Sequence, residues 1–240
     1  MFRGLLVLLF LGVAALAQDE RRVVSPDGKI EFYLFVNGQD DSNPPRIAYQ
    51  VHVGGKVLVD TSFMGFDVYT WEPLLGENAG LISETASSNA RYRTLTAHYM
   101  QNGSLARLLD VEVRVYNDGV AFRYVIGKAV SVERLQIADE STEFDLPHDP
   151  AMPLTVPLIT QEKGIGWVEL TEVPIPGFPR MQLAHEDRAG KILLTRLTRH
   201  DGPVDVVYDG KPPLTTPWRV LIVEPDRERL KQADILKDLQ

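Results

Sequence analysis

The chain has 240 residues, 44% hydrophobic and 24% charged, which is typical of a soluble globular protein. Lys and Arg total 25 against 33 Asp and Glu, a formal net charge of −8, which argues against a nucleic-acid partner because phosphate binding needs clustered cations. There is no cysteine, so disulfides, zinc–thiolate sites and thiol nucleophiles are excluded.

The first 17 residues have the pattern of a secretory signal peptide. A basic start, Met1–Arg3, precedes the apolar run Gly4–Ala14 and the A-x-A cleavage pattern Ala15–Ala17. The apolar run is too short to span a bilayer comfortably, and no later stretch reaches that length. We therefore expect residues 1–17 to be removed and the protein to be exported, periplasmic or secreted, without a membrane span.

The mature chain opens with a hairpin of β-strands. Lys29–Val36 is rich in β-branched and aromatic residues, and Arg46–Val53 alternates with a period close to two. Gly54-Gly55 then predicts a tight turn into Lys56–Val59, because glycine adopts positive φ without steric cost.

A meander of three antiparallel strands is expected next. Thr94–Met100 and Leu105–Tyr116 flank Asn102-Gly103, a dipeptide that favours a primed hairpin turn. Leu105–Tyr116 then meets the turn Asn117–Gly119 and returns as Val120–Ile126. Apolar side chains alternate along these strands, which predicts one buried face.

The remainder also favours strands, apart from the tail. Prolines between Pro147 and Pro179 predict loops and edge strands there. Arg227–Leu239 has helical spacing, and Asp226 is a suitable N-cap. We predict an all-β protein, a large antiparallel sandwich with a short C-terminal helix. The other expected strands are Val130–Ile137, Thr142–Asp145, Trp167–Val173, Lys191–Leu197, Pro203–Tyr208 and Trp218–Val223.

Two segments carry a resemblance to a known family. Val111–Ile126 reads V-E-V-R-V-Y-N-D-G-V-A-F-R-Y-V-I, and Thr216–Ile222 reads T-P-W-R-V-L-I. With S-P-D-G-K at Ser25–Lys29 and G-K-V-L at Gly55–Leu58, the chain resembles the N-terminal domain of glycoside hydrolase family 97. The resemblance implies a galactose mutarotase-like β-super-sandwich over residues 18–225. In the family, this sandwich precedes a catalytic (β/α)₈ barrel.

The resemblance also implies what this chain lacks. Such a barrel takes about 250 residues, and residues 226–240 resemble the helical link that leads into it. The family's catalytic carboxylates lie in the barrel, so we expect no catalytic residue here. Family members bind calcium through a Glu in a strand reading roughly I-T-E-A-D. We align this strand with Leu194–Thr198, which places Arg196 at the Glu, and a cation cannot ligate calcium. We therefore expect no metal site and no cofactor.

Arg123 and Trp167 are the candidate carbohydrate-binding residues. Arg123 can donate to sugar hydroxyls or carboxylates, and the exposed face of an indole can stack on a pyranose ring. The ordinary alternatives are an ion pair of Arg123 with Glu112 or Asp110, and a structural role for Trp167. Tyr69 and Trp71 are further stacking candidates.

Three functions remain open. The first is a non-catalytic sandwich that binds carbohydrate or docks onto a separately encoded barrel. The second is a mutarotase-like enzyme or small glycosidase, with His52 and His98 converging on Glu112 or Glu169. The third is the N-terminal half of a split glycosidase.

Overall fold

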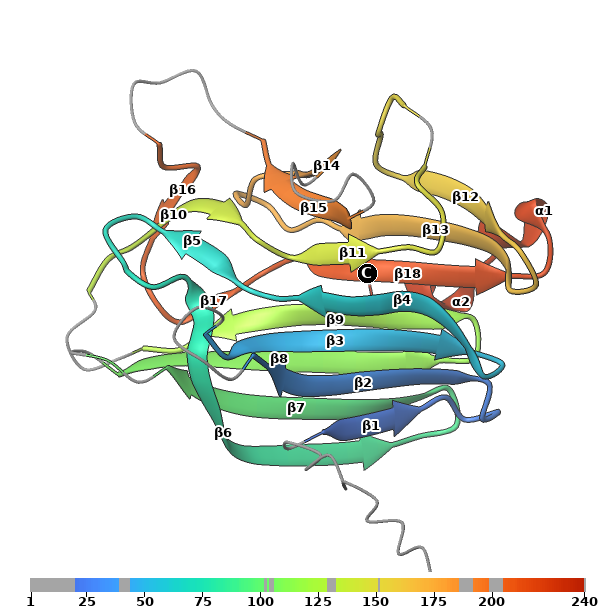
Figure 1. Ribbon diagram of the computed structural model, residues 1–240, viewed down its shortest axis with the longest axis horizontal. Helices are drawn as coiled ribbons and strands as arrows, with labels where there is room; N and C mark the ends of the chain where they lie inside the picture. Colours follow the sequence, from blue (N-terminus) through green and yellow to red (C-terminus); the bar gives the residue numbers. More distant parts are fainter. Residues whose placement is uncertain are drawn as a thin grey trace, which may run out of the picture.

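The computed structural model shows an antiparallel β-sandwich in which strands of three sheets share one core (Figure 1). The described residues form 18 strands and two short helices. The expected all-β sandwich is therefore confirmed. The predicted signal, residues 1–17, lies outside the described residues. The structure describes residues 20–38, 44–101, 103, 106–128, 133–150, 152–185, 192–198 and 205–239.

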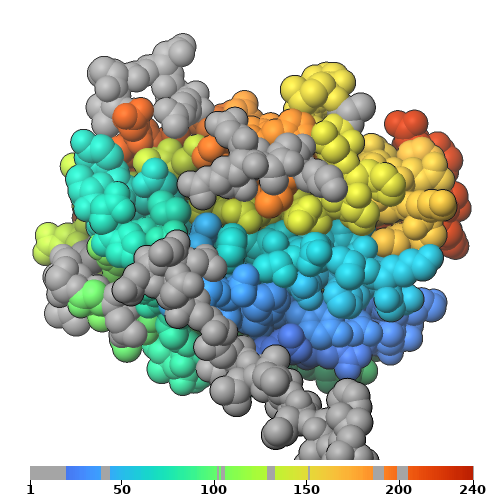
Figure 2. All heavy atoms as spheres, viewed as in Figure 1, coloured from blue at the N-terminus to red at the C-terminus, as the bar shows by residue number. Residues whose placement is uncertain are grey.

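The N-terminal strands form the front layer in Figure 1, and their blue and cyan atoms cover much of the lower half of the face seen in Figure 2. The order is β1 (Arg21–Val24), β2 (Ile30–Asn37), β3 (Arg46–Val53) and β4 (Lys56–Phe63), each antiparallel to its neighbour. The expected turn at Gly54-Gly55 joins β3 to β4, with φ values of 56° and 76°. Glycine is required there because both residues lie in the left-handed region.

The predicted meander forms most of the second layer. β7 (Tyr92–Gln101), β8 (Arg107–Tyr116) and β9 (Gly119–Ile126) pair in sequence order. β18 (Trp218–Glu224) joins β9, and β13 (Gly166–Val173) joins β18. The short β12 (Leu158–Glu162) and β17 (Leu214–Thr215) pair with β13 and β9 respectively.

A third group of strands closes the upper part of the sandwich in Figure 1. β11 (Glu143–Asp145) links β4 to β15 (Ile192–Leu197), which pairs with β14 (Met181–His185). β10 pairs with β5 and β16. The bounds of these last three are Leu135–Glu140 for β10, Phe66–Val68 for β5 and Tyr208–Gly210 for β16.

A strand that the sequence did not predict connects the two layers. β6 (Leu75–Ser88) has 14 residues. Its beginning pairs with β3 and β5, whereas the part from Ala79 onward pairs with β7. Its register shifts between Leu81 and Ser83. β6 therefore belongs to both layers.

The core is aromatic where the layers face each other. Phe32, Tyr49, Phe122 and Phe144 are fully buried, and their ring centroids lie 5.1–6.2 Å apart in successive contacts. These rings come from β2, β3, β9 and β11, so one cluster joins all three sheets. Such aromatic contacts stabilise a core beyond the area that they bury.

The expected C-terminal helix is divided into two. α1 (Arg227–Leu230) begins at the predicted N-cap Asp226, whose side chain accepts the backbone N–H of Arg229. α2 (Asp234–Leu239) starts where the Asp118 carboxylate accepts the backbone N–H groups of Asp234 and Ile235. The turn between β8 and β9 thus satisfies the first N–H groups of α2, so a new helix starts there.

The expected strand Pro203–Tyr208 differs from the structure where it is described. Residues 203 and 204 lie outside the described residues, Asp205–Val207 form an irregular bend, and β16 begins only at Tyr208. The backbone N–H of Val207 still bonds the carbonyl of Ile137, so the chain joins the edge of β10 just before the strand starts.

Candidate functional site

Arg123 projects from the outer face of β9. Its neighbour Phe122 points into the core, whereas its own Nε lies 2.5 Å from a carboxylate oxygen of Glu112 on β8. The guanidinium also lies 4.4 Å from the centroid of the Trp218 ring. These two contacts match the structural alternative of a cross-strand ion pair, and the sugar-binding role of Arg123 stays a prediction.

Trp167 lies at the start of β13, half-buried on the same outer face. It packs against a cluster of buried apolar residues between this face and the C-terminal helices, which includes Trp218, Ile222 and Ile235. The guanidinium of Arg227 in α1 lies 5.6 Å from the centroid of its ring. Val173, six residues further along β13, pairs with Trp218 beside Arg123. Six residues of strand span about 20 Å, so Arg123 and Trp167 do not form one site.

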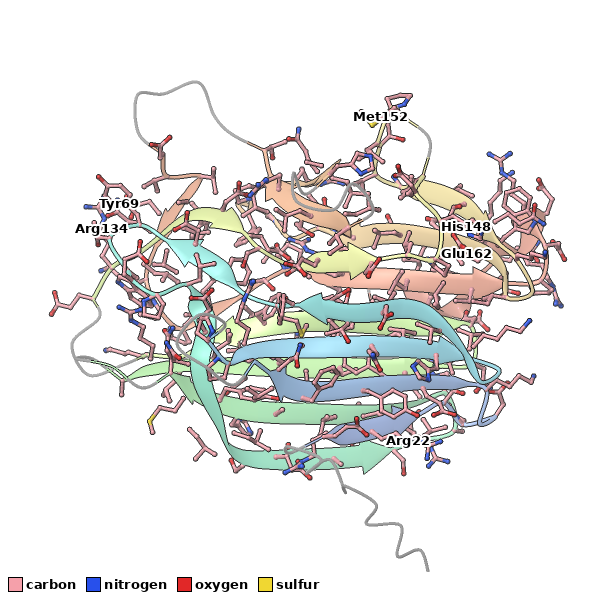
Figure 3. The ribbon with its side chains drawn as sticks, in the orientation of Figure 1. Arg22, Tyr69, Arg134, His148, Met152 and Glu162 are labelled. Atoms are coloured by element: carbon pink, nitrogen blue, oxygen red, sulfur yellow. The ribbon has the colours of Figure 1, made fainter. Side chains whose placement is uncertain are left out.

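The other stacking candidates lie elsewhere. Tyr69 follows β5 and is 43% exposed, at the upper left of Figure 3. The Trp71 ring carries the Arg107 guanidinium 4.6 Å from its centroid. Tyr69 is therefore the more accessible of the two rings.

The histidines of the enzyme hypothesis do not converge. His52 lies on β3 and contacts the ring of Tyr33, on the face opposite the buried Val51. His98 lies on β7, opposite the buried Ala97, and its Nδ1 is 2.9 Å from Asp110. Because Val51 and Ala97 share the core between the layers, His52 and His98 point outward on opposite sides of the sandwich.

A surface histidine that sequence reasoning passed over has a buried partner. The Nδ1 atom of His148 lies 2.6 Å from the carboxylate of Glu162, and Figure 3 shows the two beside β12. The Glu162 side chain is completely buried, whereas that of His148 is 59% exposed. The pair anchors the connection between β11 and β12 onto the sandwich.

A buried charge network is the main polar feature that sequence reasoning missed. Arg219 of β18 donates two hydrogen bonds to Glu140 of β10 and a third, of 2.9 Å, to Glu172 of β13. All three side chains are at most 1% exposed. Arg180 covers Glu172 from the surface with a further ion pair. Arg219 is the Arg of the T-P-W-R-V segment, which was the one signal in the sequence.

The electrostatics of the network follow from its burial. Burial alone would lower the pKa of Arg219, but the attraction of Glu140 and the hydrogen bonds to it raise the pKa above its usual value. Tyr124 lies next to this network and donates to or accepts from Thr142 at 2.6 Å. Burial, with the negative charge of Glu140, raises the pKa of Tyr124 far above the ordinary range.

A hollow of about 950 Å³ lies above the buried network, and we call it the β5–β15 hollow. Its walls come from β3, β5, β6, β10, β11, β14 and β15. Carboxylates outnumber guanidinium groups on its walls by five to two. The lining residues are Arg46, Asp67, Leu74, Glu77, Asp139, Glu140, Ser141, Glu143, Gln182, Leu194, Arg196 and Leu197.

Arg196, the residue aligned with the calcium-binding Glu of the family, lies on the wall of this hollow. Its side chain is 45% exposed and lies 3.4 Å from Asp139. In the part of the chain that the structure describes, no three His, Asp or Glu side chains gather in a way that could hold a metal ion. The expected absence of a metal site stays a prediction.

Three donors surround the carboxylate of Glu172. In this structure that carboxylate accepts hydrogen bonds from Arg180, Arg219 and the backbone N–H of Met181. A metal ion at Glu172 would therefore have to displace or sit beside Arg180.

Solved glycoside hydrolases contain a domain with the same architecture. The chain shares its fold with part of a glycoside hydrolase family 97 enzyme from Pseudoalteromonas sp. strain K8, solved with acarbose. The TM-score is 0.75 at 17% identity, over 92% of this chain and 38% of that one. A β-arabinopyranosidase gives a TM-score of 0.68 at 18% identity, over 87% of this chain and 40% of that one. The fold is thus that of a domain found within glycoside hydrolases.

A match between this sequence and a known family identifies the family to which the chain belongs. Residues 23–155, more than half of the chain, match the family described as Glycosyl-hydrolase 97 N-terminal. The chain belongs to this family, as its resemblance predicted. A probable retaining alpha-galactosidase of Streptomyces bingchenggensis (strain BCW-1) is 25% identical over 91% of this chain. The chain spans only 38% of that relative's length.

Proposed function

We propose that this sandwich is a non-catalytic accessory domain of a glycoside hydrolase, which docks onto a catalytic domain and binds carbohydrate. The observation that supports it is the match of nearly the whole chain to about two fifths of enzymes that act on glycosides. The catalytic domain is either part of the same polypeptide or separately encoded, as in a split glycosidase. The outward, separate positions of His52 and His98 favour this role over a mutarotase-like enzyme.

Docking is tested by co-purification. An affinity-tagged chain, expressed in its native host, is expected to retain a protein with a (β/α)₈ barrel, identified by mass spectrometry. Reading the DNA downstream of codon 240 gives an independent check, because an in-frame or neighbouring barrel identifies the same partner. If no barrel co-purifies and none is encoded nearby, the docking role is wrong.

The absence of catalysis has its own test. The purified chain beginning at Gln18 is expected to hydrolyse no aryl α-galactoside or α-glucoside and to leave the rate of sugar anomer exchange unchanged. Turnover that disappears in the pair His52→Ala and His98→Ala would contradict the proposal in favour of a self-sufficient enzyme.

Export is the remaining part of the proposal and rests on residues 1–17. The protein is proposed to act in the periplasm or outside the cell. None of the described helices is long and apolar enough to cross a bilayer. Cell fractionation, with detection in the periplasm or medium, tests this part.

A further inference from the structure

The β5–β15 hollow contains hydrogen-bonding atoms that the protein itself does not satisfy. The guanidinium of Arg46 stacks 4.4 Å from the centroid of the Phe63 ring. Its Nε lies 3.5 Å from Glu77, and another nitrogen lies 3.8 Å from Glu143, both beyond good hydrogen-bond distance. Nε is buried and has no hydrogen-bond partner. Arg46 is thus held by stacking and charge while its Nε–H lacks an acceptor.

Ser141 is a second such group on the same wall. Its backbone N–H donates to the carbonyl of Gly65 at 3.0 Å, which fixes the residue between β10 and β11. Its hydroxyl oxygen is buried and has no partner. Buried polar atoms without partners are uncommon, and a bound ligand or ordered water is the usual explanation. Two of them line this one hollow.

The chemistry of the walls narrows the class of ligand. The carboxylates of Asp67, Glu77 and Glu143 give the walls an excess of negative charge, which would repel an anion. A metal ion fits poorly, because Arg46 lies among these carboxylates and no metal-binding group of three is found among the described residues. A neutral polyol suits both kinds of partner, since each hydroxyl donates to a carboxylate and accepts from a guanidinium or hydroxyl.

The size and the apolar part of the hollow agree with this chemistry. About 950 Å³ lies within the range of sites for small organic ligands, which is about 300–1,000 Å³. Leu74, Leu194 and Leu197 line it beside the charged groups. Sugar rings present both hydroxyl groups and apolar C–H faces, so a short saccharide matches this mixture.

We propose that the β5–β15 hollow binds a neutral saccharide, whose hydroxyl groups complete the hydrogen bonds of Arg46 Nε and Ser141 Oγ. This proposal gives the carbohydrate-binding part of the proposed function a location, and it rests on that part. It differs from the predicted residues Arg123 and Trp167, which lie on the outer face of the second layer.

Isothermal titration calorimetry of the chain beginning at Gln18 tests the site, with melibiose and panose as neutral probes and galacturonic acid as the anionic one. We expect both neutral sugars to bind, with galacturonic acid at least ten-fold weaker. Ser141→Ala should weaken the neutral sugars about five-fold, the effect of one neutral hydrogen bond. Arg46→Met should weaken them about ten-fold or more, because a charged donor is lost.

Controls separate the site from the function on which it rests. Arg134→Met removes an exposed guanidinium that pairs with Asp209 outside the hollow, and it should leave sugar affinity unchanged. If Arg46→Met does not fold, Ser141→Ala decides alone. Sugar binding that Ser141→Ala leaves intact overturns this site, whereas the carbohydrate-binding function stands. If neither melibiose nor panose gives heat, both the site and the carbohydrate-binding function are overturned. If calcium chloride binds and Ser141→Ala weakens that binding, the ligand of the hollow is a metal ion and not a saccharide.

Discussion

At the scale of single residues, Arg219 lies at the centre of the buried charge network. It pairs with two fully buried carboxylates, Glu140 and Glu172, that lie on different strands, and Arg180 supplies a second cation to Glu172. Removing one partner of such a group leaves buried charge without compensation, which costs far more than the group contributes when intact. The packing of β10, β13 and β18 at this point thus depends strongly on this guanidinium.

Arg219→Met is expected to lower the free energy of unfolding by about 3–5 kcal/mol. Urea denaturation followed by circular dichroism measures the loss. Arg134→Met, which removes an ion pair between exposed side chains, serves as the matched control and should leave the midpoint unchanged. If Arg219→Met loses no more unfolding free energy than the control, leaving Glu140 and Glu172 without this partner does not carry the predicted cost.

Glu169 gives a pH dependence of known sign. Burial raises the pKa of Glu169 above its usual value. The folded state therefore binds its proton more tightly than the unfolded chain does, and this group lowers stability as pH rises through the interval between the two pKa values. Glu169→Gln should raise the melting temperature at pH 7 and have little effect below pH about 4, under the ordinary pKa. Thermal melts at both pH values check this; an equal shift at both would contradict it.

At the scale of elements, the turn between β8 and β9 is fixed by a close backbone approach. A Cβ atom on Gly119 would lie 2.3 Å from the carbonyl oxygen of Leu221 on β18. The first residue of β9 must therefore be glycine for β18 to pair with it. The N-D-G segment, read in the sequence as a turn, has this second role in the sheet.

Gly119→Ala should destabilise the protein by about 2 kcal/mol or more, because the two strands must move apart. Gly80→Ala on β6 is the control, since a Cβ there meets nothing within 4 Å and no left-handed φ is required. Chemical denaturation of both variants measures the contrast. Similar losses in both would mean that the backbone contact at Gly119 relaxes freely.

The attachment of α2 gives a second prediction at this scale. Asp118 accepts two backbone N–H groups at its start, and Asp238 near its end accepts the Tyr116 hydroxyl at 2.8 Å. Asp118→Ala should speed amide hydrogen exchange over Asp234–Leu239 and leave the core strands protected. Lys237→Ala, which removes an exposed ion pair with Asp234 and a hydrogen bond to the carbonyl of Gln232 but leaves Asp118 in place, is the control. Unchanged exchange in Asp118→Ala would show that packing alone holds α2.

Sequence patterns predicted the strands along which buried and exposed side chains alternate, but they did not predict contacts between residues far apart in the chain. β3 matches its predicted bounds because Ile47, Tyr49 and Val51 alternate along it. β6 was missed because Leu75–Ser88 is rich in Gly, Ala and Ser, and its second half is exposed on both faces. The partners of Arg219 lie 79 and 47 residues away. No local pattern could therefore predict the network, or the hollow above it.

At the scale of the whole molecule, the leader predicted at residues 1–17 is the basis for the proposal that the protein is exported. Small residues at Ala15 and Ala17 are what signal peptidases require next to the cut. Ala15→Arg should block cleavage, because a large charged side chain does not fit where a small one is read. Mass spectrometry of the wild-type exported protein should find Gln18 at the N-terminus, and the variant should retain its leader. A wild-type protein that keeps Met1 would contradict the signal.

The course of β6 has a mechanical consequence for the whole sandwich. One continuous backbone is hydrogen-bonded first into the front layer and then into the back layer. Separating the two layers therefore requires breaking the backbone pairing of the start of β6 with β3 and β5, in addition to exposing the apolar core. A domain loaded from outside by a partner would resist shear along this seam.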